Sequence, residues 1–146
     1  MVALSILDLA RVREGGDARD ALVQARTLAV QAEASGFTRF WVAEHHSDKA
    51  LASGAPEVLV AAIAARTSTL RVGSGGVLLP YYQPFKVAEQ FNLLEALFPG
   101  RIDLGLGRSG GSERHAPHAL GLKPERMAAE GAFAAIDELL SWLGSG

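Results

Sequence analysis

The chain has 146 residues, 49% of them hydrophobic, which is enough for one domain with a buried core. Fourteen basic and 16 acidic residues give a net charge of −2, and there is no basic cluster for binding nucleic acid or an anionic membrane. The absence of cysteine excludes disulfides, thiolate metal sites and cysteine nucleophiles. The sequence shows neither a signal peptide nor an apolar run near the ~20 residues of a membrane span, so we expect a cytoplasmic protein.

The first part of the chain predicts two strand–helix units. Residues 4–9 have the pattern of a short apolar strand, and a helical pattern follows over residues 17–35. A second strand is predicted over residues 37–43, and a second helix begins at Pro56, where proline suits the first helical turn. The predicted apolar face of the first helix consists of Leu22, Ala25, Leu28, Ala29 and Ala32.

The second part of the chain repeats this pattern twice. A third strand over residues 70–79 is interrupted by glycines, and a helix is predicted over residues 84–98. A fourth strand is predicted over residues 101–106. The last helix is predicted to run without a break over residues 124–143, and residues 144–146 form a Gly-Ser-Gly tail.

The four predicted strands begin 33, 33 and 31 residues apart, with a helix after each. This alternation is typical of an α/β protein with a parallel sheet, either doubly wound or a (β/α)8 TIM barrel. Because a complete TIM barrel needs roughly 200 residues or more, four units correspond to half of one. We therefore expect residues 1–143 to form a half-barrel of four β/α units.

Polar residues and glycines gather where the predicted strands end, at residues 8–13, 44–48, 73–82 and 105–113. In both architectures the carboxyl ends of the strands meet at one edge of the sheet, and ligands bind there. We expect a functional site at this edge.

The second strand ends in Glu44-His45-His46. Side chains alternate along a strand, so Glu44 and His46 are expected on one face and His45 on the other. A histidine at this position can transfer a proton near neutral pH, and the neighbouring carboxylate can orient it. A strand end that simply faces solvent is the alternative. A metal site with His115 and His118 is disfavoured, because a proline between these two residues breaks their helical spacing.

The glycines of the third and fourth strands permit two interpretations each. Residues 73–76 form either a β-bulge or a surface for a flat cofactor beside Tyr81 and Tyr82. Residues 105–110 match the G-x-G-x-x-G pattern of dinucleotide-binding proteins, but a long polar loop follows instead of a helix. A phosphate site is therefore favoured here, with Arg108 and Arg126 as candidate ligands.

Several of these motifs together resemble one known family. The stretches WVAEHH, GSGGVLLP and FPGRIDLGLGR resemble the amino-terminal half of bacterial-luciferase-like, flavin-dependent monooxygenases, and the resemblance extends over nearly the whole chain. Members of this family form a (β/α)8 barrel. They use reduced flavin mononucleotide (FMN), supplied by a separate reductase, and O2 to oxidise a small-molecule substrate.

The resemblance implies a role for each candidate residue. His45 corresponds to the catalytic histidine that stabilises the oxygenated flavin and assists proton transfer, and Glu44 is its acidic neighbour in the motif. The pair Gly75 and Gly76 corresponds to small residues that pack against the flavin ring through a cis peptide bond. Arg108 and Arg126 correspond to arginines that face the flavin phosphate. No metal is implied.

The resemblance also leaves alternatives open. An oxidoreductase that uses the deazaflavin F420 has the same barrel, and a non-catalytic flavin-binding or subunit-partner module would retain the same residues. The half-barrel itself is expected either to form a homo-oligomer or to associate with a complementing second half. Residues that select the substrate lie largely in the other half of the family's barrel.

Overall fold

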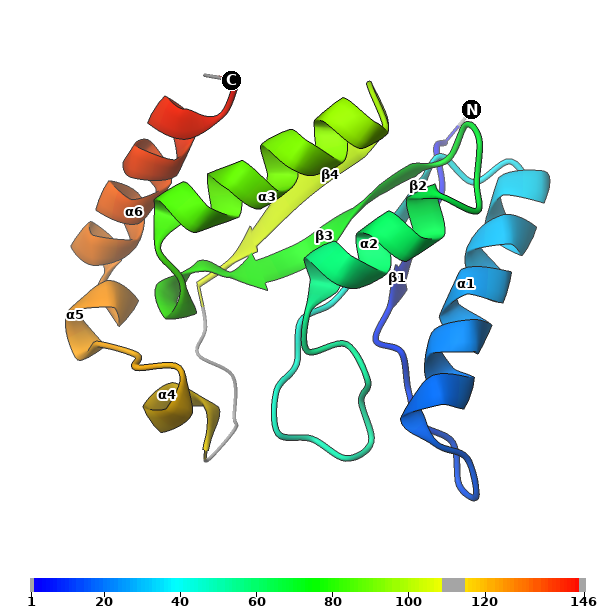
Figure 1. The fold of residues 1–146 in the computed structure, drawn as a ribbon, viewed down its shortest axis with the longest axis horizontal. Helices are drawn as coiled ribbons and strands as arrows, with labels where there is room; N and C mark the ends of the chain where they lie inside the picture. The colour runs from blue at the N-terminus through cyan, green and yellow to red at the C-terminus, as the bar shows by residue number, and fades with distance from the viewer. Residues whose placement is uncertain (1, 109–114, 145–146) are drawn as a thin grey trace.

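The computed structural model describes residues 2–108 and 115–144. Its centre is a four-stranded parallel sheet in the order β1-β2-β3-β4 (Figure 1). The predicted parallel α/β class is thereby confirmed, and the strands follow each other in space as they do in sequence. Their bounds are Ser5–Asp8 for β1, Arg39–Val42 for β2, Arg71–Leu78 for β3 and Ile102–Gly107 for β4.

Helices follow each strand (Figure 1). Helix α1 follows β1, α2 follows β2, a 3-10 turn η1 and then α3 follow β3, and α4 to α6 follow β4. No helix within the described ranges is long and apolar enough to cross a membrane. The helical bounds are α1 Ala18–Ala34, α2 Pro56–Ala64, η1 Leu79–Tyr81, α3 Pro84–Leu97, α4 Ala116–Ala119, α5 Pro124–Met127 and α6 Ala129–Trp142.

The first helix begins and ends close to the predicted residues. The Asp17 carboxylate accepts the Asp20 N–H, and the Asp20 carboxylate accepts the Asp17 N–H, so the two form a capping box. The buried face of α1 is made of alanines, and Leu28, which was predicted on it, is exposed. Small side chains at this face allow α1 to lie close to the sheet.

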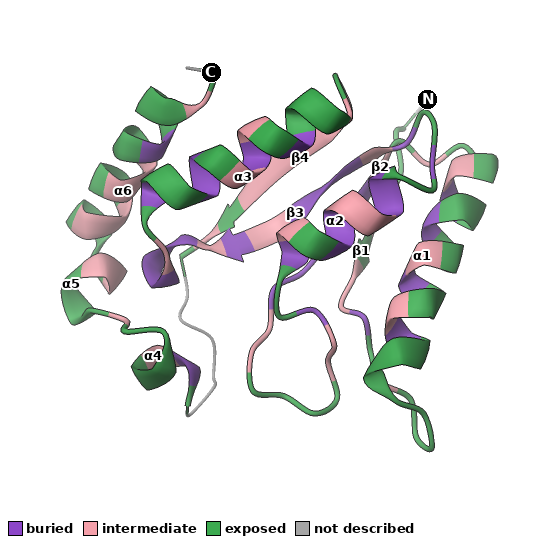
Figure 2. Cartoon of the chain, in the orientation of Figure 1, coloured by how far each residue is buried: buried purple, intermediate pink, exposed green. Residues whose placement is uncertain are grey.

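The hydrophobic core lies between the helices and one face of the sheet (Figure 2). In β2, Phe40 and Val42 are fully buried on this face, while Arg39 and Trp41 lie on the opposite, partly exposed face. The sheet is thus covered on one side only, as expected for part of a barrel wall. Val72 of β3, Val60 and Ile63 of α2 and Val87 and Phe91 of α3 complete the centre of the core.

The predicted last helix is not continuous. Ala128 has an extended backbone with φ −66° and ψ 150°, and it separates α5 from α6. The short helix folds back against the longer one at Gly131, where an added Cβ would lie 2.2 Å from the carbonyl oxygen of Glu125. The prediction of one helix was wrong because the helical periodicity does not reveal this close contact between consecutive turns.

An ion network lies on the uncovered face of the sheet, at the amino ends of the strands. The Asp103 carboxylate of β4 accepts hydrogen bonds from Arg39 Nε at 3.1 Å and from Arg71 Nε at 3.0 Å. Burial raises the pKa of Asp103, but the bonds from Arg71 and Arg39 outweigh it and hold the pKa below its usual value. The hydrogen bond to Asp103 and the charges of Asp103 and Glu95 raise the pKa of Arg71, so a second carboxylate also acts on this network.

Strands β3 and β4 approach each other so closely that only glycine fits at several positions. An added Cβ at Gly73 would lie 2.2 Å from the carbonyl oxygen of Asp103, and one at Gly105 would lie 2.3 Å from that of Ser74. The pairing of β3 with β4 has a register shift between Ser74 and Val77, which agrees with the β-bulge, one of the two interpretations of residues 73–76. The strand nevertheless continues through the glycines to Leu78, rather than being interrupted by them.

Glu33 connects α1 to the segment that enters β3. Its Oε1 accepts backbone N–H groups from Ser68 at 2.8 Å, Thr69 at 2.6 Å and Leu70 at 2.8 Å, as well as the Thr69 hydroxyl. Burial raises the pKa of this carboxyl group, but the backbone hydrogen bonds from Thr69, Leu70 and Ser68 outweigh it and lower the pKa to about 2. The bonds to an ionised carboxylate therefore fasten α1 to the sheet.

We expect the replacement Glu33→Gln to lower the free energy of unfolding by about 1 kcal/mol at neutral pH, because a partly exposed charge contributes less than a buried one. Since the folded pKa lies below the unfolded value of 4.5, the contribution of Glu33 is complete above pH 4.5 and is lost as the pH falls towards about 2. Urea unfolding of both proteins between these pH values should show the difference shrinking. Glu14→Gln, at an exposed position, is the control. A pH-independent difference would contradict this account.

We expect Gly73→Ala to destabilise the protein by about 2 kcal/mol or more, because the new methyl group would force β3 and β4 apart. Gly54→Ala is a matched control, since a Cβ at Gly54 meets no atom closer than 3.6 Å. Thermal unfolding followed by circular dichroism measures both. Equal melting temperatures for the two variants would show that the strands are less tightly packed than described.

Candidate functional site

The segments after β1 and β2 are joined to each other. The Ala52 N–H donates to Ala10 O at 2.9 Å, and an antiparallel bridge pairs Arg11 with Leu51. Ala10 and Ser47 have positive φ values of 47° and 56°, which are uncommon for residues other than glycine and are frequent at functional sites. These loops therefore form one defined wall at the carboxyl edge of the sheet.

Buried Ser53 fastens the histidine-containing loop to this wall. Its hydroxyl donates to Leu9 O at 3.2 Å, and its carbonyl oxygen accepts the His45 N–H at 3.0 Å. Sequence reasoning did not identify Ser53, because a serine in a loop carries no signal of its own. The half-buried His45 thus has a defined backbone position.

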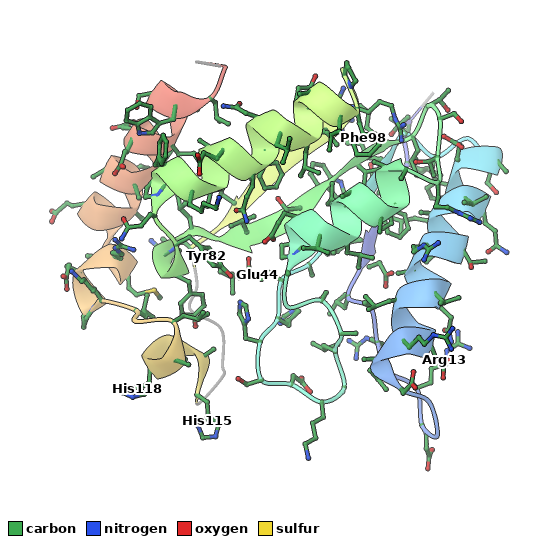
Figure 3. The ribbon with its side chains drawn as sticks, viewed as in Figure 1. Arg13, Glu44, Tyr82, Phe98, His115 and His118 are labelled. Atoms are coloured by element: carbon green, nitrogen blue, oxygen red, sulfur yellow. The ribbon has the colours of Figure 1, made fainter. Side chains whose placement is uncertain are left out.

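The Glu44 carboxylate is buried and accepts several hydrogen bonds (Figure 3). Its Oε2 accepts the Leu78 N–H at 2.9 Å. Its Oε1 accepts the Tyr82 hydroxyl at 2.7 Å and lies 2.6 Å from His46 Nε2. Burial raises the pKa of Tyr82, and the hydrogen bond to Glu44 raises it further, so the phenol remains a donor.

The two histidines consequently have different surroundings. Glu44 and His46 share a side, as the alternation predicted, and the carboxylate orients His46. The His46 ring also packs edge-on against Tyr81, with ring centroids 5.7 Å apart. Tyr81 is buried, and the Tyr82 hydroxyl is bound to Glu44. The tyrosines therefore build the wall of the site, a role that their sequence positions alone did not indicate.

The Gly75–Gly76 pair lies where β3 approaches the site. The peptide bond between these two glycines is cis. A Cβ at Gly75 would lie 2.9 Å from Trp41 Cβ and 3.1 Å from Leu7 Cδ1, which places this glycine on the uncovered face of the sheet. The missing side chain therefore lets Trp41 and Leu7 pack directly against the backbone of β3 at this point.

Arg108 and Arg126 line the same cavity, although they are far apart in the sequence. The cavity has a volume of about 130 Å³ and lies between the end of β4, η1 and α6. Arg126 donates to Tyr82 O at 3.1 Å and to Gln83 Oε1 at 3.0 Å, which holds its guanidinium against the turn after β3. Arg108 is exposed at the end of β4. The lining is otherwise apolar apart from Gly107, so the two arginines alone are suited to an anionic group.

The other candidate residues do not join this cluster. His115 and His118 project from α4 away from Glu44 and Tyr82 (Figure 3). Among residues 2–108 and 115–144, no group of three or more histidine, cysteine, aspartate or glutamate side chains is arranged to hold a metal ion. The last glycine of the G-x-G-x-x-G pattern, Gly110, lies outside the described residues.

Comparison with known proteins gives the chain a family context. The luciferase-like monooxygenase family profile matches residues 2–143. The Bacillus subtilis (strain 168) protein YwcH is 58% identical over 120 residues, which are 82% of this chain and 36% of YwcH. N-acetyl-S-alkylcysteine monooxygenase of the same organism is 51% identical over 120 residues, again 82% of this chain and 36% of the relative. The chain thus spans about a third of the length of these relatives.

Solved structures agree with this comparison. Apo-MsnO8 is 43% identical and superposes with a TM-score of 0.90 over 98% of this chain and 42% of its own. The oxygenating constituent of 3,6-diketocamphane monooxygenase from Pseudomonas putida, in complex with FMN, is 27% identical with a TM-score of 0.77, over 91% and 38% of the two chains. An F420-dependent secondary alcohol dehydrogenase, 22% identical with a TM-score of 0.67, shares the fold.

Proposed function

Because the chain belongs to the luciferase-like monooxygenase family, we propose that it is the amino-terminal half of a flavin-dependent monooxygenase that uses a reduced flavin and O2 to oxidise a small organic substrate. The observation that carries the proposal is the cavity lined by both Arg108 and Arg126 at the carboxyl edge of the sheet. An enzyme of this fold class binds its ligands at that edge.

We assign the cofactor as reduced FMN, delivered by a separate reductase. The FMN complex of a monooxygenase with the same fold supports this choice, whereas the likeness to the F420-dependent enzyme concerns the fold alone. When bound, the flavin supplies the electrons that activate O2. The residues of the chain fit such a ligand, because two arginines lie beside one cavity.

Each candidate residue then has a distinct task. Gly75 and Gly76 provide a flat backbone surface for the flavin ring. Arg108 binds the flavin phosphate directly. Arg126, already bonded to the turn after β3, contributes charge from a fixed position. His45, on the loop after β2, holds and transfers a proton beside the reacting part of the ring.

A second set of strands is proposed to complete the site. Strands β1 and β4 are the edges of the described sheet, and Leu7 of β1 is 54% exposed on the uncovered face. Unpaired edges favour association with further strands. We propose that a complementing second half-barrel, or a second copy of the chain, covers this face and supplies most of the substrate pocket.

A non-catalytic flavin-binding or subunit-partner module is the alternative. It is favoured by apolar side chains on the outer surface of α2 and α3, where Val58, Leu93 and Leu97 are 65%, 61% and 59% exposed. Such a module would bind flavin or a partner without needing His45.

We expect Arg108→Gln to weaken the binding of reduced FMN about tenfold while leaving reduced riboflavin unaffected, because only FMN carries a phosphate. Anaerobic calorimetry with both ligands measures this difference. Arg66→Gln, at an exposed arginine after α2, is the control. Equal losses for both ligands would place Arg108 away from the phosphate, and tighter binding of F420 than of FMN in the same titration would favour the deazaflavin alternative.

We expect the chain alone, with reduced FMN and O2, to oxidise an N-acetyl-S-alkylcysteine very slowly or not at all. Turnover should rise when the carboxyl-terminal two-thirds of the Bacillus subtilis N-acetyl-S-alkylcysteine monooxygenase is supplied as a separate chain. His45→Ala should abolish this gain and retain FMN binding. Robust turnover by the chain alone would contradict the need for a second half, and full turnover with His45→Ala would favour the binding module.

A further inference from the structure

The Glu44 carboxylate is the most completely buried charged group beside the candidate site. Its side chain is 0% exposed, and both of its oxygens accept hydrogen bonds. Burial of an ionised carboxylate is costly unless donors replace its lost water. Three donors meet this need: a backbone N–H, a phenol and an imidazole. A carboxylate that is this enclosed cannot also bind a ligand.

The chemistry of the acceptor determines where the protons lie. An ionised carboxylate only accepts, so the Tyr82 hydroxyl and the His46 Nε2–H must both donate to it. The two donor atoms are 3.4 Å apart because they converge on the same oxygen, Oε1. The His46 ring is therefore directed at Glu44.

The same contacts connect the segments at the ends of two different strands, β2 and β3. Glu44 and His46 belong to the loop after β2, Leu78 is the last residue of β3, and Tyr82 ends the turn η1. The carbonyl oxygen of Tyr82 in turn accepts a hydrogen bond from Arg126 of α5. Tyr82 thus joins the histidine loop, through its hydroxyl group, to an arginine of the cavity, through its backbone carbonyl.

We propose that Glu44 is a positioning residue, which acts through His46 and Tyr82 to hold His45 and Arg126 at fixed positions around the ligand. In the sequence, His45 lies between Glu44 and His46. Both of these neighbours are held in place by the hydrogen bonds of the Glu44 carboxylate. The role of this clamp, defined as Glu44, His46, Leu78 N–H and Tyr82, in ligand binding rests on the proposed function. The clamp itself rests on the hydrogen bonds alone.

The test uses Glu44→Gln and Tyr82→Phe, with Glu57→Gln as the matched control. The Glu57 carboxylate accepts a hydrogen bond from Gln90 and is not part of the clamp. A glutamine at position 44 cannot accept from all three donors, because one carboxylate oxygen is replaced by an amide donor. The phenylalanine removes one hydroxyl and retains the carbonyl oxygen that Arg126 contacts.

Three measurements test the clamp: hydrogen exchange of the Leu78 amide, titration of the tyrosines and binding of reduced FMN. In Glu44→Gln, hydrogen exchange of the Leu78 amide should accelerate about tenfold, as expected for a lost hydrogen bond to a charged acceptor. Burial, the larger cause of the raised Tyr82 pKa, remains in this variant, but the contribution of the Glu44 carboxylate is lost, so tyrosinate absorbance should appear at lower pH; Tyr82→Phe identifies which of the two tyrosines contributes. Reduced FMN should bind about tenfold more weakly to Glu44→Gln. The control should match the wild-type protein in exchange and in FMN affinity.

The outcomes separate the clamp from the proposed function. Unchanged Leu78 exchange and an unchanged tyrosine titration in Glu44→Gln would overturn the clamp. A loosened clamp with unchanged FMN affinity would overturn its positioning role. A loosened clamp in a protein whose wild-type form binds no flavin would refute the proposed function and leave the clamp standing. If Glu44→Gln does not fold, Tyr82→Phe decides, because weaker FMN binding by this variant supports positioning and unchanged binding opposes it.

Discussion

The close approach of β3 and β4 is the constraint on which the rest of the structure depends. Gly73 and Gly105 leave no room for a side chain between these strands, so their backbones lie in direct contact. Strand β3 contains the Gly75–Gly76 cis peptide and ends at Leu78. The position of β3 therefore determines where these two glycines and the turn η1 lie. The Glu44 carboxylate reaches Leu78 only because β3 extends this far.

The regular part of the fold could be predicted from the sequence because local physics determines it. The capping aspartate at Asp17 and the proline at Pro56 place two helix starts correctly. The near-constant spacing of the strands predicted a parallel sheet, which is confirmed, and the observed order of the strands is the one that a half-barrel has. The alternation rule also predicted that Glu44 and His46 share a side, which their hydrogen bond confirms.

Contacts between distant residues could not be predicted in the same way. Tyr82 and Glu44 are 38 residues apart, and nothing near either one indicates the other. The helix is interrupted at Ala128, whose backbone is extended, close to the point where Gly131 leaves room for the carbonyl oxygen of Glu125. This interruption depends on the space at Gly131 and not on the helix propensity of the residues. The glycine-rich motif and the family resemblance both indicated Arg108 and Arg126, but only the structure shows that one cavity lies beside both.

The ion network of Arg39, Arg71 and Asp103 behaves differently in an open and in a covered sheet. With Arg39 42% exposed, water and dissolved salt weaken the attraction between these groups. Covering the face would move the same three charges into a medium of lower dielectric constant, where every attraction and repulsion among them becomes stronger. A surface that closes over this face therefore changes the strength of the network as well as burying the apolar side chains beside it.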